Sequence, residues 1–103
     1  MGSRTGQAYE AVQRELQKER AAALGRIGRR LEVLLTRLAE LRAEWQAADA
    51  TARPPLALAY AECRDEARQY RWYLEVQREA VGLRYHHDLD RCYPIPPELD
   101  VQS

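Results

Sequence analysis

An apolar seven-residue repeat from Leu24 to Ala48 is the feature that most constrains the fold of this chain. Its members fall three and four positions apart without a miss: Leu24, Ile27, Leu31, Leu34, Leu38, Leu41, Trp45 and Ala48. This spacing lines one side of a helix with side chains that face another helix. Leu35 widens the stripe, as helices in a bundle require. The repeat therefore predicts a first long helix over about residues 5–50, packed against a helical partner.

Gly25 and Gly28 lie inside this first predicted helix. Two glycines in one helical turn cost roughly 2 kcal/mol relative to alanine. The apolar repeat nevertheless keeps its spacing from Leu24 through Ile27 to Leu31. We expect a continuous helix with a soft point, and a kink or break at Gly25–Gly28 is the alternative. Close approach of a neighbouring helix at the two glycines would compensate for their cost.

A second helix is expected after the turn at residues 51–55, where Pro54 and Pro55 punctuate the sequence. Pro54 disfavours a helical Arg53, and a proline suits the first turn of the next helix. The second helix is predicted over about residues 56–91, antiparallel to the first because the connection is short. Its side facing the first helix is expected to consist of Leu56, Cys63, Ala67, Tyr70, Leu74 and Val81.

The predicted fold class is all-α: one domain over residues 1–103, built as a long helical hairpin with an extended, proline-rich tail at residues 92–103. The tail has too many prolines to be helical. Tyr93, Ile95 and Leu99 have a spacing that would let them pack on Tyr9 and Val12. These N-terminal turns otherwise lack a helical neighbour, so we expect the tail to cover them, in its own chain or in a partner chain.

The second predicted helix carries more apolar surface than one partner helix can cover. Trp72, Val76 and Leu83 form a stripe away from the hairpin seam, and Tyr73 flanks that seam. Hairpins of this size usually pair. We therefore expect a homodimeric four-helix bundle, with this side of the second helix at or near the two-fold axis.

These features favour a self-associating, non-enzymatic protein that binds another protein as an adaptor, assembly factor or regulator. Tryptophan, tyrosine and arginine most often carry the binding energy of interfaces. The predicted partner-binding residues are Trp72, Tyr73, Val76, Leu83, Tyr85, His86, Tyr93 and Ile95. The expected partners are a second copy of the chain and another protein.

A basic run from Arg20 to Arg30 supports a first alternative, a nucleic-acid or phosphate-binding accessory protein. The candidate contacts are Arg26, Arg29 and Arg30. Against this alternative, 16 basic and 16 acidic residues cancel over the 103-residue chain. A neutral chain lacks the electrostatic attraction that nucleic acids and anionic membranes exploit. Nucleic acid is therefore the less favoured partner, and no membrane is expected because no long apolar run is present.

A metal-binding bundle is the second alternative. His86 and Asp90 are four positions apart and could share an ion on one helix face, with Cys92 nearby. Charge pairing and the helix dipole explain a histidine near a helix end more simply, so no metal or other cofactor is predicted. For catalysis, the only serines are Ser3 and Ser103, and no phosphate-binding loop is present. Two cysteines far apart on one helix and the lack of a secretory leader predict a reducing, cytoplasmic location.

Overall fold

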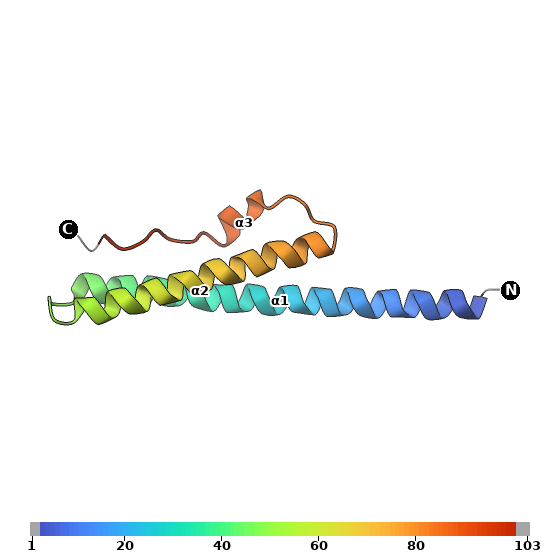
Figure 1. Cartoon of the computed structure of the whole chain (residues 1–103), viewed down its shortest axis with the longest axis horizontal. Helices are drawn as coiled ribbons and strands as arrows, with labels where there is room; N and C mark the ends of the chain where they lie inside the picture. The colour runs from blue at the N-terminus through green and yellow to red at the C-terminus, as the bar shows by residue number, and fades with distance from the viewer. Residues whose placement is uncertain (1–2, 101–103) are drawn as a thin grey trace.

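The computed structural model describes residues 3–100, which form two long helices and one short helix (Figure 1). Helix α1 spans Ser3–Ala47, α2 spans Arg53–Ala80 and α3 spans His87–Cys92. Helices α1 and α2 pack against each other as an antiparallel hairpin, within an elongated shape of 76 × 21 × 15 Å. The predicted all-α hairpin is confirmed, and the last predicted tail residues, 101–103, lie outside the described part.

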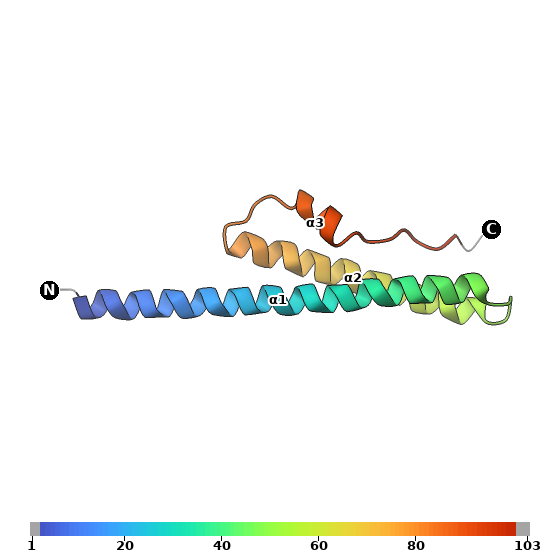
Figure 2. The same cartoon turned by 180° about the vertical axis from the view of Figure 1, so that it is seen from behind.

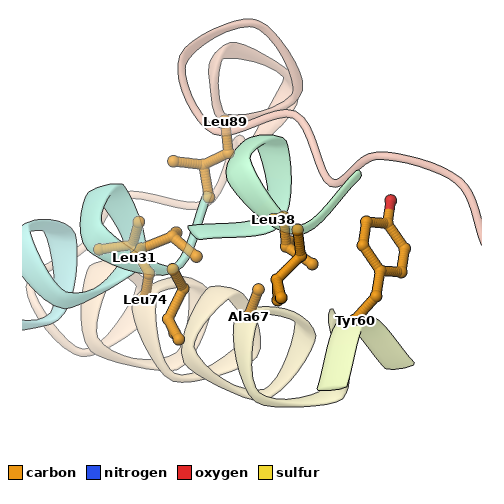
Figure 3. Close-up of a cluster of buried hydrophobic side chains, with 8 residues drawn as sticks. Leu31, Leu38, Tyr60, Ala67, Leu74 and Leu89 are labelled. Carbon is orange, nitrogen blue, oxygen red and sulfur yellow. The ribbon is translucent and has the colours of Figure 1, made fainter. Parts of the chain in front are cut away.

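The core is the seam between α1 and α2, and its α1 side is the middle of the predicted repeat. Leu31 and Leu38 of α1 are fully buried and face Ala67 and Leu74 of α2 (Figure 3). Burying each leucine contributes about 1.5–3 kcal/mol. The complete buried cluster is Leu31, Leu34, Leu38, Leu41, Tyr60, Ala67, Leu74 and Leu89. No helix within residues 3–100 has the length and apolar character needed to cross a membrane.

Helix α1 continues without interruption through Gly25 and Gly28. The predicted continuity is confirmed, but the expected close approach of a helix is wrong. A Cβ on Gly28 would lie 3.0 Å from the hydroxyl oxygen of Tyr93, which belongs to the C-terminal tail. A Cβ on Gly25 would lie 3.2 Å from a guanidinium nitrogen of Arg29 in the same helix. Only Gly28 is thus required by a tertiary neighbour.

The turn between α1 and α2 is organised by Asp49. Its carboxylate accepts hydrogen bonds from the backbone N–H groups of Thr51 and Ala52, at 3.1 and 2.9 Å. Arg53 then donates its Nε–H to the carbonyl of Trp45 at 3.1 Å, and its guanidinium lies 4.8 Å from the Trp45 ring centroid. Arg53 thereby satisfies a free carbonyl at the end of α1. Helix α2 begins at Arg53, earlier than predicted, so Arg53 is helical although Pro54 follows it.

Helix α2 ends at Ala80, so the prediction of a helix reaching residue 91 is wrong. Gly82 has a positive φ of 94°. The N–H of Gly82 donates to the Glu79 carbonyl at 3.0 Å, and that of Leu83 donates to the Arg78 carbonyl at 2.9 Å. This pair of bonds is a Schellman motif, in which glycine ends a helix at low steric cost. Val81, expected in the seam, is instead the exposed C-cap residue.

After Gly82 the chain reverses, and α3 and the tail run back along the hairpin toward its turn (Figures 1 and 2). Leu89 of α3 is buried in the core cluster, and Tyr93, Ile95 and Leu99 pack against that cluster. The tail therefore covers the α1–α2 hairpin of its own chain. The expected location on the turns of Tyr9 and Val12 is wrong for this chain, because the reversal directs the tail away from them.

Candidate interaction surfaces

The face of α2 that points away from α1 carries large exposed apolar side chains. Trp72 is 58% exposed, and Tyr73 and Val76 are also exposed, as the sequence predicts. The Trp72 and Tyr73 ring centroids lie 5.5 Å apart, and Gln69 donates a 2.9 Å hydrogen bond to the Tyr73 hydroxyl. We call Trp72, Tyr73 and Val76 the outer patch. Most of the Trp72 side chain is left uncovered by the fold, and all three residues project from the continuous helix α2.

The segment between α2 and α3 adds exposed apolar residues beyond the outer patch. Leu83 is half exposed, and Tyr85 is 79% exposed. Arg78 holds this segment by donating to the Tyr85 carbonyl at 3.1 Å and to the Asp88 carboxylate at 3.0 Å. The predicted partner-binding residues Leu83 and Tyr85 are thus accessible on a segment that ion pairs fix in place.

His86, Tyr93 and Ile95 were also predicted to contact a partner, and the structure places them mostly within the chain itself. The His86 ring lies against α2, with Nε2 3.0 Å from the Glu79 carboxylate. Tyr93 and Ile95 are half-buried against the hydrophobic core. The structure therefore exposes Trp72, Tyr73 and Val76 together, whereas His86, Tyr93 and Ile95 are partly buried against their own chain. Of the latter three, Ile95 lies beside Trp72, with which it lines a small surface hollow.

Three side chains of α2 hold the tail through its backbone carbonyls. Tyr60 donates its hydroxyl to the Pro97 carbonyl at 2.7 Å, Arg64 donates Nε–H to the Pro96 carbonyl at 2.8 Å, and Arg71 donates to the Tyr93 carbonyl at 3.4 Å. Prolines have no N–H, so a proline-rich segment offers mainly acceptors. The hydroxyl of Tyr60 and the guanidinium groups of Arg64 and Arg71 supply the hydrogen-bond donors that these carbonyl groups need.

Sequence reasoning missed this tail-binding row. Its signal was the spacing of Tyr60, Arg64 and Arg71, because residues four and seven positions apart lie along one side of a helix. Tyr60 is almost fully buried, and its hydroxyl points toward the tail (Figure 3). A tyrosine and two arginines in line beside an apolar seam therefore indicate donors for a docked extended segment.

The proposed metal pair is not assembled as expected. His86 precedes α3 and pairs with Glu79, whereas Asp90 lies within α3 and accepts a hydrogen bond from Arg71. The two residues therefore do not share one regular helix face. Over residues 3–100, no three His, Cys, Asp or Glu side chains gather in a way that could hold a metal ion.

The basic run divides between two roles. Arg30 donates to the Glu66 carboxylate of α2 at 2.6 Å and lies 6.0 Å from the Tyr70 ring centroid. The hydrogen bond that Arg30 donates to Glu66 is the main cause that raises the pKa of Arg30 above its usual value. Arg26 and Arg29 remain exposed. One of the three candidate phosphate contacts is thus committed to the α1–α2 interface.

A groove of about 820 Å³ lies between α1 and α2 on the side that the tail does not cover. Its lining includes Arg37 and Glu66 and one thiol, that of Cys63. Burial, followed by the charge of Glu66, raises the pKa of the Cys63 thiol. The thiol also lies 3.6 Å from the Leu34 carbonyl, to which it donates. A protonated thiol is a poor nucleophile, so the groove lacks an activated group at this position.

No family model, curated protein or solved structure matches this chain. The proposals below therefore draw on its own residues and their contacts.

The cysteines predicted to be unpaired, Cys63 on α2 and Cys92 on α3, are both free thiols. They lie on separate helices, and not on one continuous helix as expected.

Proposed function

We propose that this chain is a non-enzymatic, self-associating helical protein that acts by binding another protein, as an adaptor, assembly factor or regulator. The observation that carries the proposal is the outer patch, in which Trp72, Tyr73 and Val76 are exposed side by side on α2. Contiguous exposed apolar side chains of this kind mark interaction surfaces on soluble proteins.

The outer patch is available because the other sides of α2 already have neighbours. One side of α2 packs on α1 through Ala67 and Leu74. An adjacent side holds the tail through Arg64 and Arg71. Trp72 takes part neither in the packing on α1 nor in the hydrogen bonds to the tail. Tryptophan and tyrosine are enriched among the residues that dominate binding energy. A partner helix or groove that buries Trp72 would gain most of its affinity there.

The chemistry of the thiols supports a binding role over a catalytic one. Cys63 has its pKa raised by burial, which opposes the thiolate form that attacks substrates. Cys92 is exposed at the end of α3. The ring of His86, one of two histidines near Cys92 in the sequence, has its Nε2 engaged with the Glu79 carboxylate. His86 is therefore already paired and does not favour a thiolate–imidazole pair with Cys92.

The test is recovery of a partner from the native cell by proximity cross-linking to the intact chain. The double variant Trp72→Ala/Val76→Ala should lose the recovered protein, and circular dichroism should show an unchanged fold because both side chains are exposed. Leu58→Ala is the matched control, since Leu58 is an exposed apolar residue of α2 at a distance from the patch. Equal recovery by the double variant and the wild-type chain would contradict the proposal.

A further inference from the structure

The N-terminal part of α1 extends well beyond the end of α2 (Figures 1 and 2). Leu24 is the first residue of α1 that packs against the core cluster. Residues 3–22 therefore form an overhang of roughly 30 Å, at about 1.5 Å per residue. A lone helix of this length is marginally stable in water. The overhang would gain stability from a partner along its side.

The overhang carries an apolar stripe that continues the covered seam of α1. Tyr9 is 66% exposed and Val12 is 56% exposed, and Leu16 is also exposed. Tyr9 precedes Ile27, and Leu16 precedes Leu34, by the same interval of about five full helical turns. Tyr9 and Leu16 thus point in the directions of Ile27 and Leu34, which face α2 and its core. One seam runs along α1, and α2 covers only part of it.

We propose that a second copy of this chain covers the rest of the seam, with the two overhangs packed antiparallel about a two-fold axis near Val12. This inference rests on the proposed self-association and names its surface. The α1 helix of the second copy would run antiparallel to the first α1, as α2 does. It would cover the part of the seam that α2 leaves exposed. The paired surfaces are identical, as a two-fold interface requires.

The overhang contains a hollow that fits a side chain of the second copy. A recess of about 350 Å³ is lined by Val12, Glu15, Leu16 and Glu19, together with Ala11. Val12, Glu15, Leu16 and Glu19 are at positions i, i+3, i+4 and i+7. Four residues with this spacing form the hole that accepts one side chain, the knob, of the facing helix in a coiled coil. In an antiparallel pair centred near Val12, the side chain opposite this hole is Tyr9 of the second copy. Its ring would fill the recess, and its hydroxyl would reach the rim carboxylates.

The flanking residues suit the same register. In this register Arg4 of one copy lies beside Glu19 of the other, so that a positive and a negative side chain meet. Arg20 is the one charged residue on the stripe between Leu16 and Ala23. With pairs centred on Val12, Arg20 lies level with about residue 4 of the second copy, close to the end of the paired segment, so that its guanidinium can reach water.

The first test is the mass in solution of the full chain and two matched variants, measured by sedimentation equilibrium. Val12 and Val33 are valines of α1 with almost equal exposure, 56% and 57%. Val12→Glu places two carboxylates at the two-fold axis and should raise the dimer dissociation constant at least ~30-fold. Val33→Glu should leave it unchanged. Glutamate favours helix more than valine, so neither variant should unfold α1.

The second test is the length of the dimer by small-angle X-ray scattering. Pairing through the overhangs gives a rod on the order of 120 Å long, since the overhangs share about 30 Å. A side-by-side four-helix bundle would stay close to the 76 Å of one chain. A dimer of that shorter length, or one that survives Val12→Glu, overturns this inference but leaves self-association standing. A monomer at high micromolar concentration overturns both.

Discussion

The hydroxyl oxygen of Tyr93 lies 3.0 Å from the position that a Cβ on Gly28 would occupy. Tyr93 follows α3, and Gly28 is in the middle of α1, so this contact joins the start of the tail to the hairpin. The ring of Tyr93 is half-buried and packs against the core. A glycine that weakens α1 locally thus provides the space in which the tail docks.

Replacing the two helical glycines with alanine should separate helix propensity from tail packing. Gly25→Ala should raise the free energy of unfolding by about 1 kcal/mol, since only the flexible Arg29 side chain must move. Gly28→Ala has the same propensity gain, but its methyl group crowds the Tyr93 hydroxyl. We expect it to be less stable than Gly25→Ala by about 1 kcal/mol or more, in urea denaturation at fixed protein concentration.

The Tyr93→Phe background is the control for this comparison. Removing the hydroxyl takes away the atom that the Gly28→Ala methyl group would meet. The stability difference between the two alanine variants should then shrink. Equal stability of the two variants with Tyr93 present would show that the tail does not pack on α1 at Gly28.

Gly82→Ala should weaken the end of α2. An alanine at a φ of 94° is sterically strained, at a cost of about 1–2 kcal/mol. Gly82→Asn should cost less, because asparagine adopts positive φ more readily. Thermal unfolding should therefore rank the chains as glycine, then asparagine, then alanine. An alanine variant as stable as the wild-type chain would indicate a helix that continues past residue 80.

Tyr60→Phe should loosen the tail while leaving the hairpin folded. The substitution removes the 2.7 Å hydrogen bond to the Pro97 carbonyl and should cost about 1 kcal/mol. Amide hydrogen exchange after Pro97 should accelerate, and exchange in the middle of α1 should change little. Tyr85→Phe is the control, because the Tyr85 side chain is 79% exposed and its stability effect should lie within about 0.5 kcal/mol. Unchanged exchange in the tail would contradict the assigned role of Tyr60.

The reactivity of Cys63 should depend on pH in the direction that burial dictates. A raised pKa leaves less thiolate at any pH below it, so alkylation should be slower in the folded chain than in urea. The rate should keep rising with pH beyond the range where an ordinary thiol levels off. Iodoacetamide labelling followed by mass spectrometry can measure Cys63 and the exposed Cys92 in one sample. Faster labelling of Cys63 when folded would contradict this prediction.

The outer patch shows how far a candidate site could be predicted from the sequence. Trp72 and Val76 fall away from the seam by their position in the helical repeat, and both are exposed. Tyr93 and Ile95 were assigned to a partner, whereas both pack on their own chain. Their location depends on a reversal at Gly82, and apolar periodicity carries no information about the direction of the chain after a helix ends.

The sequence by itself determined the antiparallel hairpin, because an apolar repeat and a proline turn act locally and favour the same structure. Leu31 and Leu38 are buried where the repeat places them. Only the tertiary structure decided the path of the tail. That path needs the positive φ of Gly82, the space at Gly28 and the hydroxyl of Tyr60 at once, and these residues are far apart in the sequence. The reversal also leaves the N-terminal part of α1 uncovered, which no local pattern encodes.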